Sequence, residues 1–340
     1  MTLLKPYLII IKSILFYLFD SLALWKVPSP LLNELELVFL IRQDGIGDFV
    51  MWLDSAKEYR KLYPPDKYKI VLVGNKIWYE LAEELPYWDE VVPVDVKQFK
   101  TFSSYRWKLL RTIRKLKIET AIQPTFSREF YHGDALVRAS GALRKVSSAG
   151  DMANRNWLKQ FLADRWHTEL IPASTEPLTE LERNAEFFSG LTDSPHLTRY
   201  PKLDIQEFWL SSEWKDKTFY ILVPGTSGAV AGKEWPPDFF SDLATKVFRQ
   251  TGWEGAICGA KQERSLGEQI LKQCDAPLQN LCGQTTLVEL AGLLSQSRLT
   301  ISNDTGTVFL SSAVGTLSVC ILGGGHFGRF VPYPDLPGQA

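Results

Sequence analysis

The sequence is poor in the residues that hold metals and disulfides. Its 340 residues include four cysteines and four histidines, and none of these form a CxxC or HxxxH pair. We therefore expect no zinc site, and unpaired thiols of this kind are typical of a reducing compartment. The formal net charge of −1 excludes a globally basic nucleic-acid-binding protein.

A run of apolar residues near the N-terminus is too short to be a clear membrane span. Residues 7–19 read YLIIIKSILFYLF, and Lys5, Lys12 and Asp20 interrupt their surroundings. About 20 apolar residues are needed to cross a bilayer, and no clear small-residue cleavage site follows. Two interpretations stay open: a helix at the membrane surface with Lys5 and Lys12 at the headgroups, or a helix packed on the first domain. A single spanning helix ranks third.

The rest of the chain alternates between strand and helix patterns. Short apolar runs predict buried strands at 35–40, 69–74, 90–94, 120–123, 218–223, 255–258, 299–302 and 317–322. Helical patterns lie at 77–85, 105–116, 239–248, 263–272, 287–294 and 308–314. Alternation of this kind predicts parallel sheets with crossover helices. The length suggests two domains, which we place at 31–200 and 201–340 after an N-terminal helix in 1–30, with the proline-containing region 172–201 connecting them.

The most informative pattern follows the first predicted strand. Residues 41–49 read IRQDGIGDF, so two glycines permit a tight turn with close backbone approach before a helix. Asp48 stands where that helix begins and has two interpretations. It is an N-cap that accepts free amide hydrogens, or a general base that takes a proton from an incoming hydroxyl. Asp44 is a rival for the second role, and Arg42 is placed to orient either carboxylate.

Two turns in the second half suit a phosphorylated ligand. Residues 224–228, PGTSG, follow a strand, and their backbone amides with the hydroxyls of Thr226 and Ser227 fit a phosphate. Lys233 is a candidate to neutralise a departing diphosphate, because the sequence predicts no metal cluster for that task. The alternative is a surface turn with a solvated lysine.

The second such turn is SNDTGT, residues 302–307, which leads into an apolar helix. Free amides at that helix start would hold a phosphate near Asp304, Thr305 and Gly306. The alternative is helix capping by Asp304 or Thr305. Glu263 is a candidate to accept hydrogen bonds from a ribose, although acids at helix starts are common.

A basic stretch occupies residues 97–117. It contains no acid and includes Arg106, Lys108, Arg111, Arg114 and Lys115. It is either a solvated helix face or a cradle for an anionic acceptor or anionic lipid headgroups. Its aromatic residues also permit nucleic-acid binding, but no recognised motif supports that reading.

Four segments together resemble glycosyltransferase family 9, the lipopolysaccharide heptosyltransferases. They are RQDGIGDFVMW, PGTSG with KEWPPDFF, SNDTGTVFLSSAVGT and GGGHFGRFVPYP, in the family's order from Arg42 to Pro334. The resemblance implies a GT-B fold, in which two Rossmann-like domains face each other across a cleft. It also implies a metal-independent transferase that inverts configuration, uses ADP-heptose and acts at the cytoplasmic face of the bacterial inner membrane.

The resemblance assigns roles by position. Asp48 corresponds to the family's proposed catalytic base, and Lys233 to the lysine that meets the donor's diphosphate. The donor-binding positions are Thr226, Ser227, Glu263, Asp304, Thr305 and Gly306. No cofactor is implied, because the nucleotide sugar is a substrate. The expected partners are that donor, an anionic glycolipid or glycan acceptor, and an inner-membrane surface reached through residues 1–25; no nucleic acid is expected.

The sequence departs from the family at two places. Phe309 stands where many members have histidine, three residues after the Asp-Thr-Gly glycine. The sequence also ends at Ala340, where members usually continue into a closing helix, so we expect either a replacement contact from the N-terminal helix or an incomplete sequence. Two rival functions follow: a nucleotide-sugar epimerase on the same fold, and a non-catalytic, membrane-associated protein that binds the donor.

Overall fold

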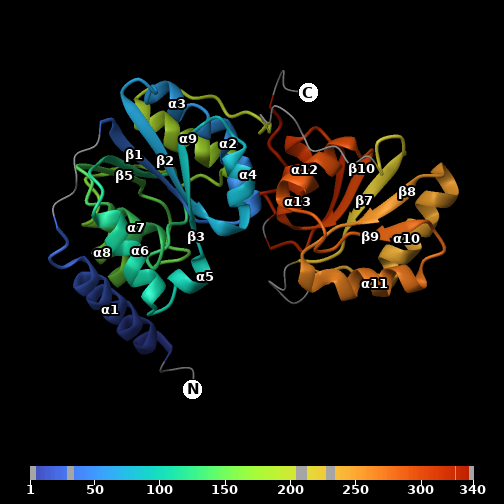
Figure 1. The fold of residues 1–340 in the computed structure, drawn as a ribbon, viewed down its shortest axis with the longest axis horizontal. Coiled ribbons are helices and arrows are strands. Elements are labelled where there is room, and N and C mark those ends of the chain that lie inside the picture. Colours follow the sequence, from blue (N-terminus) through green and yellow to red (C-terminus); the bar gives the residue numbers. More distant parts are fainter. Residues whose placement is uncertain (1–4, 29–33, 204–212, 227–233, 326, 337–340) are drawn as a thin grey trace. The chain divides into compact units, whose positions relative to one another are not determined.

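The chain divides into two compact α/β units (Figure 1). The computed structural model describes residues 5–28, 34–203, 213–226, 234–325 and 327–336. The first unit comprises residues 1–44, 55–79 and 86–198, and the second comprises residues 45–54, 80–85 and 199–340. Both contain a parallel sheet, as the alternating pattern predicted.

The first unit is built on a six-stranded sheet in the order β3-β2-β1-β4-β5-β6. The strands are β1 (Glu36–Arg42), β2 (Tyr68–Asn75), β3 (Glu90–Val94), β4 (Ile118–Gln123), β5 (Arg144–Ser148) and β6 (Glu169–Ile171). Strand β1 lies between β2 and β4, and every residue after Glu36 is buried. An apolar strand covered on both faces is typical of the centre of a parallel sheet.

Helices cover this sheet and complete its core. They are α3 (Tyr59–Leu62), η1 (Lys76–Trp78), α4 (Tyr79–Glu83), α5 (Val96–Phe99), α6 (Ser104–Arg114), α7 (Gly133–Ser140), α8 (Trp157–Asp164) and α9 (Glu180–Thr192), with α4 running into the second unit. Phe39, Ile41 and Val73 pack in one buried cluster with Leu110 of α6 and Leu136 of α7.

The region 172–201 is more than the connection that its prolines suggested. It contains α9, whose first turn is closed by a capping box between Thr179 and Glu182. Leu181, Phe187 and Phe188 of this helix are buried. The sequence did not predict this helix, whose apolar face packs into the fold.

The second unit has a five-stranded parallel sheet in the order β11-β10-β7-β8-β9. Its strands are β7 (Phe219–Val223), β8 (Glu254–Ile257), β9 (Leu278–Asn280), β10 (Leu299–Asn303) and β11 (Ser318–Ile321). Its helices are α2 (Ile46–Ala56), α10 (Pro237–Thr251), η2 (Lys261–Glu263), α11 (Arg264–Gln273), α12 (Leu287–Gln296) and α13 (Gly306–Ala313). Tyr220, Leu222, Phe240, Ile257 and Ile301 form its core.

The four cysteines are free thiols, as expected. Burial raises the pKa of the Cys282 thiol to about 11. A thiol that stays protonated at neutral pH is a poor nucleophile, so the chemistry of this fold does not run through Cys282.

Helix α1 (Lys5–Leu24) packs along the first unit, which confirms the packed-helix interpretation. Phe16 is buried and stacks on Phe102 with ring centroids 4.0 Å apart. Ser13 shares a hydrogen bond with the Tyr131 hydroxyl at 3.0 Å. One face of α1 is therefore packed into the first unit.

A buried ion pair fastens α1 to α6. The Arg106 guanidinium donates from Nε and Nη2 to the two carboxylate oxygens of Asp20, at 2.7 and 2.5 Å. Its Nη1 donates to the carbonyl oxygens of Phe99 and Tyr131. Both charged side chains are almost fully enclosed. Breaking such a pair is costly, since loss of one partner leaves the other charge buried and uncompensated.

We expect Asp20→Ala to destabilise the first unit by about 3–5 kcal/mol, because Arg106 would lose its buried counterion. Urea denaturation followed by the fluorescence of the tryptophans measures this change. The control is Leu18→Ala on the exposed side of the same helix, for which about 0.5 kcal/mol or less is expected. Equal effects of the two substitutions would show that α1 is not anchored by the ion pair.

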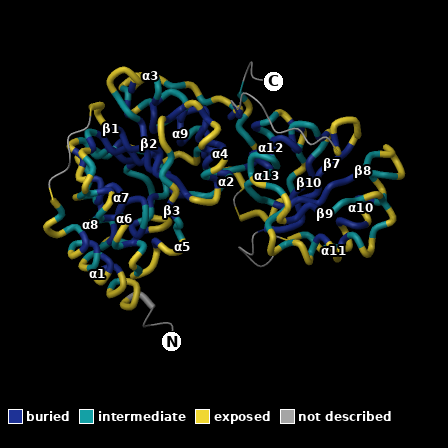
Figure 2. Tube along the Cα trace, viewed as in Figure 1, coloured by how far each residue is buried: buried dark blue, intermediate teal, exposed yellow. Residues whose placement is uncertain are grey.

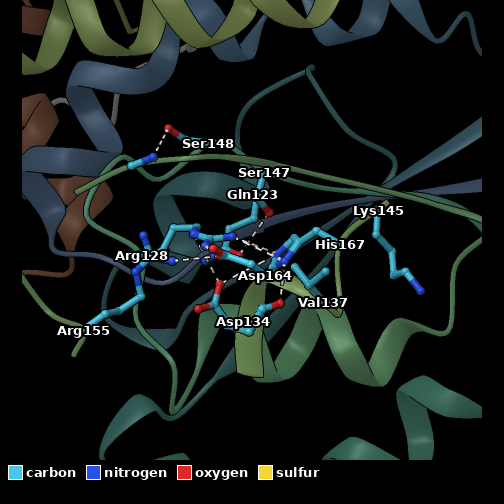
Figure 3. A network of polar contacts seen from close by, with 12 residues as sticks. Gln123, Arg128, Asp134, Val137, Lys145, Ser147, Ser148, Arg155, Asp164 and His167 are labelled. Carbon is cyan, nitrogen blue, oxygen red and sulfur yellow. Dashed lines mark hydrogen bonds and ion pairs between the residues drawn. The ribbon is translucent and has the colours of Figure 1, made fainter. Parts of the chain in front are cut away.

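A second buried polar cluster lies between α7 and α8 (Figure 3). Arg128 is fully buried and pairs with Asp164, and Arg155 reaches the same carboxylate at 3.3 Å. The His167 ring nitrogen Nδ1 lies 2.9 Å from the Ala163 carbonyl, and its Nε2 lies 3.4 Å from Arg128 Nη1. A neutral ring that donates from Nδ1 and accepts at Nε2 satisfies both contacts.

The charge state of His167 follows from these surroundings. Burial, then the Arg128 charge, lowers the pKa of His167 to about 3. Burial likewise holds the pKa of His132 well below its usual value, with Lys100 and Arg106 acting in the same direction. Burial raises the pKa of Asp134, although Arg128 opposes it. Both histidines are therefore neutral in the folded state across the mildly acidic range.

We expect the first unit to lose stability as the pH falls from about 6.5 toward 5. In this window the unfolded state binds protons at histidines that the folded state keeps neutral, so stability rises with pH, by up to about 1.4 kcal/mol per pH unit for each histidine. The pH dependence of urea unfolding for the wild type and for His167→Gln measures this. The variant should show a shallower slope in this window, and identical slopes would contradict the assignment.

Candidate active site

The carboxyl edge of the second sheet gathers most of the residues singled out in the sequence. The strand order reverses between β7 and β10, because the chain proceeds from β7 to β8 and β9 on one side and to β10 and β11 on the other. Ligands of open α/β sheets bind outside the carboxyl ends of strands at such a switch point. The loop after β7 begins at Pro224, and the loop after β10 begins at Asp304.

Asn303 joins these two loops. Its side chain is fully buried and donates from Nδ2 to the Pro224 carbonyl at 2.6 Å. Its Oδ1 accepts the backbone N–H of Trp235 at 3.2 Å. This one amide therefore sets the spacing between the start of the first loop, Trp235 two residues before α10, and the end of β10. Sequence analysis gave it no role, although it is the last residue of a strand directly before Asp-Thr-Gly.

Thr226 lies at the described end of the first loop. Its side chain is buried and its hydroxyl donates to Glu234 Oε1 at 2.8 Å, which closes the loop over the segment before α10. Two other predicted site residues, Ser227 and Lys233, lie outside the described residues. The roles of all three toward a donor stay predictions.

Glu263 ends η2, after β8. Its carboxylate accepts the backbone N–H of Ala260 at 2.6 Å. It also lies against the backbone of Gly225, so closely that a Cβ atom at that position would collide with the carboxylate. Glu263 and Glu234 line a pocket of about 470 Å³ beside this contact. Gly225 thus permits close packing between the loops after β7 and β8.

The Asp304-Thr305-Gly306 turn forms the N-terminal end of α13. Thr305 is the N-cap, and its hydroxyl accepts the Thr307 N–H at 3.4 Å. Its hydroxyl also lies 3.2 Å from the Ser302 hydroxyl. The capping interpretation is therefore correct for Thr305. Amides of the first helical turn of α13 remain directed at the carboxyl edge of the sheet, an arrangement that suits an anion.

Asp48 is the third residue of α2, within its first turn rather than at an N-cap. Its Oδ2 lies 3.3 Å from the position that a Cβ atom on Gly45 would take. Asp48 is half-buried and lines a pocket of about 290 Å³. The same pocket is lined by residues 304–306 and by Phe309, all in the second unit.

Two glycines allow the starts of α2 and α13 to approach each other. A Cβ atom on Gly47 would lie 2.7 Å from the Phe309 ring. One on Gly306 would lie 2.8 Å from the Ile46 Cβ atom and 3.0 Å from the Gly47 nitrogen. Gly47 thus serves close approach, the role predicted for it, whereas a Cβ atom on Gly45 would meet only the Asp48 carboxylate.

Phe309 forms an apolar wall of this pocket. It is buried and stacks on Tyr333 with ring centroids 6.1 Å apart, and it meets Phe330 edge to face at 6.4 Å. Burial raises the pKa of the Tyr333 phenol, which keeps it neutral. The residue that departs from the family pattern is therefore a packing residue that joins α13 to the segment 330–333.

This arrangement brings two carboxylates and an anion-suited helix end to the same pocket. Asp48 with Asp304, Thr305 and Gly306 belongs to it, whereas Glu263 lines the neighbouring pocket at the same sheet edge. Among the described residues, no group of three or more histidine, cysteine, aspartate or glutamate side chains is placed to hold a metal ion. A carboxylate beside a phosphate site can accept a proton from a hydroxyl while the phosphate is held.

Comparison with known proteins assigns the family. The sequence model described as "Glycosyltransferase family 9 (heptosyltransferase)" matches residues 135–338, more than half of the chain. The chain belongs to glycosyltransferase family 9. This confirms the resemblance drawn from the four segments, and it makes the protein a glycosyltransferase.

Relatives of this family 9 glycosyltransferase extend the match to most of its length. "Lipopolysaccharide heptosyltransferase 2" of Escherichia coli is 22% identical over 302 residues, which cover 84% of this chain and 82% of that protein. The structure of E. coli ADP-heptose lipopolysaccharide heptosyltransferase II aligns with a TM-score of 0.61 at 18% identity, over 83% of each chain. E. coli heptosyltransferase WaaC with ADP-2-deoxy-2-fluoro heptose aligns at 0.66 and 17% identity, over 84% of this chain and 88% of that one. The fold is therefore GT-B, as predicted.

The contact between α2 and α13 generates a prediction. We expect Gly47→Ala to destabilise the second unit by about 1–3 kcal/mol, because the new methyl group overlaps the Phe309 ring. The double variant Gly47→Ala with Phe309→Leu should recover part of this loss, giving a coupling energy of about 0.5 kcal/mol or more. Urea denaturation of the two single variants and the double variant measures the coupling. Additive effects would mean that the two side chains do not meet.

Proposed function

We propose that this protein transfers heptose from ADP-heptose to a lipopolysaccharide-core or related cell-envelope glycan, with inversion at the anomeric carbon and without a metal ion. The observation that carries the proposal is the pocket of about 290 Å³ that holds both Asp48 and the Asp304-Thr305-Gly306 turn. The names of the relatives, heptosyltransferases acting on lipopolysaccharide, support the choice of sugar and acceptor.

In this proposal Asp48 is the general base. Its carboxylate removes the proton from an acceptor hydroxyl, whose oxygen forms the new bond to the anomeric carbon. The bond from that carbon to the diphosphate breaks, and the ADP leaves from the opposite face with the electron pair. One displacement of this kind inverts the configuration, and general-base action contributes about 10²–10⁴ in rate.

The donor side stabilises the leaving group. The first-turn amides of α13, beside Gly306, and the loop at Thr226 are suited to phosphate oxygens. Lys233 supplies the positive charge that balances the departing diphosphate. Glu263 lies against Gly225 of the same loop, which supports its proposed role as an acceptor of hydrogen bonds from the ribose.

The same proposal includes the place where the reaction happens. An anionic glycolipid or glycan acceptor is assembled on a membrane, so the protein works in the cytoplasm and binds peripherally at the inner face of the bacterial inner membrane. An epimerase on the same fold would form product without any acceptor. A donor-binding protein without turnover would bind nucleotide and neither transfer nor hydrolyse the sugar.

We expect Asp48→Asn to reduce kcat by roughly 10²–10⁴, with little change in donor affinity, because only proton removal is lost. A transfer assay with ADP-heptose and heptose-acceptor glycolipid measures it. Asp238→Asn is the matched control, because Asp238 is an exposed acid in the first turn of α10. Near-normal turnover of Asp48→Asn, or loss of its nucleotide binding, would remove Asp48 from the role of base.

Thermal stabilisation by ADP, UDP, GDP, CMP and ADP-heptose tests the identity of the donor independently of the acceptor. A nucleotide at about 100 times its Kd should stabilise the protein by roughly 2.7 kcal/mol. A selective response to ADP that is lost in Lys233→Ala and kept in Asp48→Asn is the expected result. A preference for UDP or GDP would retain the fold and discard ADP-heptose as the donor.

A further inference from the structure

The outward face of α1 is apolar along its whole described length. Tyr7, Leu8, Ile11, Ile14, Leu15, Leu18, Leu22 and Trp25 are all more than 40% exposed. They recur at helical spacing on the side opposite to Ser13, Phe16 and Asp20, which are buried against the first unit. In Figure 2 exposed residues recur along α1 between buried and intermediate ones. Contiguous exposed apolar patches of this extent mark interaction sites.

A neighbouring helix extends this surface. Helix α8 packs against α1, with Trp166, two residues after its end, stacked on Tyr17 of α1 at 6.3 Å between centroids. Its side chains Trp157 and Phe161, one turn apart, are 66% and 50% exposed. Aromatic residues with one apolar and one polar end are typical of the membrane–water interface.

The charge beside the apolar face has one sign. Helix α6 packs along α1, where Trp107 meets Phe19 and Arg111 donates to the Ala23 carbonyl at 2.9 Å. Lys108 of α6 and Lys115, its C-cap, are exposed, next to Trp107 and four residues after Arg111 in the sequence. Lys12 and Lys26 on and after α1 are exposed as well.

No uncompensated acid adjoins this apolar face on the three helices. Within α1, α6 and α8 the only acids are Asp20 and Asp164. Asp20 is paired with Arg106, and Asp164 with Arg128 and Arg155. Apart from these two paired acids, the charged residues of the three helices are all basic, and the exposed Arg165 directly follows α8.

We propose that this surface docks on an anionic lipid bilayer, with α1 lying flat in the interface. The proposal deepens the membrane location given under the proposed function and names the part of the chain that makes the contact. The outer leucines and isoleucines enter the boundary between headgroups and acyl chains. The exposed lysines of α1 and α6 meet the anionic headgroups, which attract such residues.

A spanning orientation conflicts with the contacts of the inner face. Residues 7–24 are apolar and long enough to cross a membrane, but the buried members of this helix belong to the first unit. Crossing the bilayer would withdraw Asp20 from Arg106 and leave a buried guanidinium without its counterion. It would also place Ser13 and Asp20 in hydrocarbon, away from Tyr131 and Arg106.

A second copy of the chain fits the same face less well. In a symmetric dimer the same patch meets itself, so the lysines that flank the patch would be brought toward the lysines of the partner. Like charges placed together oppose association, whereas an anionic surface complements them. We therefore assign the face to lipid, and self-association becomes an outcome of the test.

Vesicle co-sedimentation of the full-length protein tests the proposal. Vesicles of phosphatidylcholine alone are compared with vesicles that also contain phosphatidylglycerol. Binding should favour the anionic vesicles and weaken with added salt. Leu15→Glu with Leu18→Glu should reduce binding on the order of 100-fold, because two side chains lose their apolar burial. Lys108→Gln with Lys115→Gln should reduce binding to anionic vesicles about five-fold per lysine and leave binding to neutral vesicles unchanged.

Leu197→Glu is the matched control, because Leu197 is 70% exposed on the first unit, after α9 and outside this surface. Circular dichroism and thermal unfolding confirm that each variant is folded. Absence of binding to anionic vesicles, or equal loss in Leu197→Glu, would overturn the proposal. Self-association that disappears in Leu15→Glu with Leu18→Glu, without vesicle binding, would assign the face to a second copy instead.

The outcome is independent of the proposed transfer reaction. Vesicle binding and stabilisation by ADP are both measured on the wild type. Stabilisation by ADP is also measured on the Leu15→Glu with Leu18→Glu variant, which should keep it because the proposed donor-binding residues are unchanged. In the wild type, vesicle binding without a nucleotide response would retain the docking surface and reject the proposed function. A nucleotide response of the wild type without vesicle binding would reject the docking surface and retain the proposed function.

Discussion

The side-chain amide of Asn303 is the interaction on which the candidate site depends. Parallel pairing of β7 and β10 brings their carboxyl ends to one edge of the sheet, but it does not set the path of the chain beyond them. The buried amide does so by holding Pro224 on one side and Trp235 on the other. An unpaired buried amide is costly, so both partners are held once the strand is in place.

Specific close contacts also position the start of α2 and the helix α1 on the first unit. Gly47 and Gly306 allow two helix starts to approach until a single methyl group would collide, so the pocket that holds Asp48 has a defined wall. On α1, the Asp20–Arg106 pair orients the helix, so that its apolar side has to face outward. In each case a few specific contacts position a larger surface. These contacts position the candidate functional surfaces, whereas the hydrophobic cores form the rigid units that carry them.

The parts of the fold that could be predicted are those whose signal is apolar and local. Strands β1, β2 and β7 were found because they are buried on both faces and contain continuous apolar runs. Strand β5, Arg-Lys-Val-Ser-Ser, was missed because its buried serines are satisfied by hydrogen bonds, such as that from Ser147 to Gln123, rather than by apolar contact. Helix α9 was missed because the prolines around it suggested a connection.

In the candidate site, too, some features could be predicted from the sequence and others could not. Asp48 and the Asp-Thr-Gly turn stand out in sequence because small and charged residues follow apolar strands. Their meeting in one pocket could not be predicted, since it depends on how α2 and α13 pack. Asn303 was overlooked because an asparagine at a strand end has no distinctive pattern until its partners, 79 and 68 residues away, are known.

Phe309 shows how a departure from a family pattern can be absorbed by packing. A histidine at this position would bring a polar ring to the pocket, whereas Phe309 lies between Gly47, Phe330 and Tyr333. An apolar ring here adds contact area between α13 and the segment 330–333 and offers no hydrogen bond to a ligand. Under the proposed function, polar contacts to the donor would then come from other groups, such as the amides and hydroxyls of the turn at residues 304–306 and the hydroxyl of Thr226.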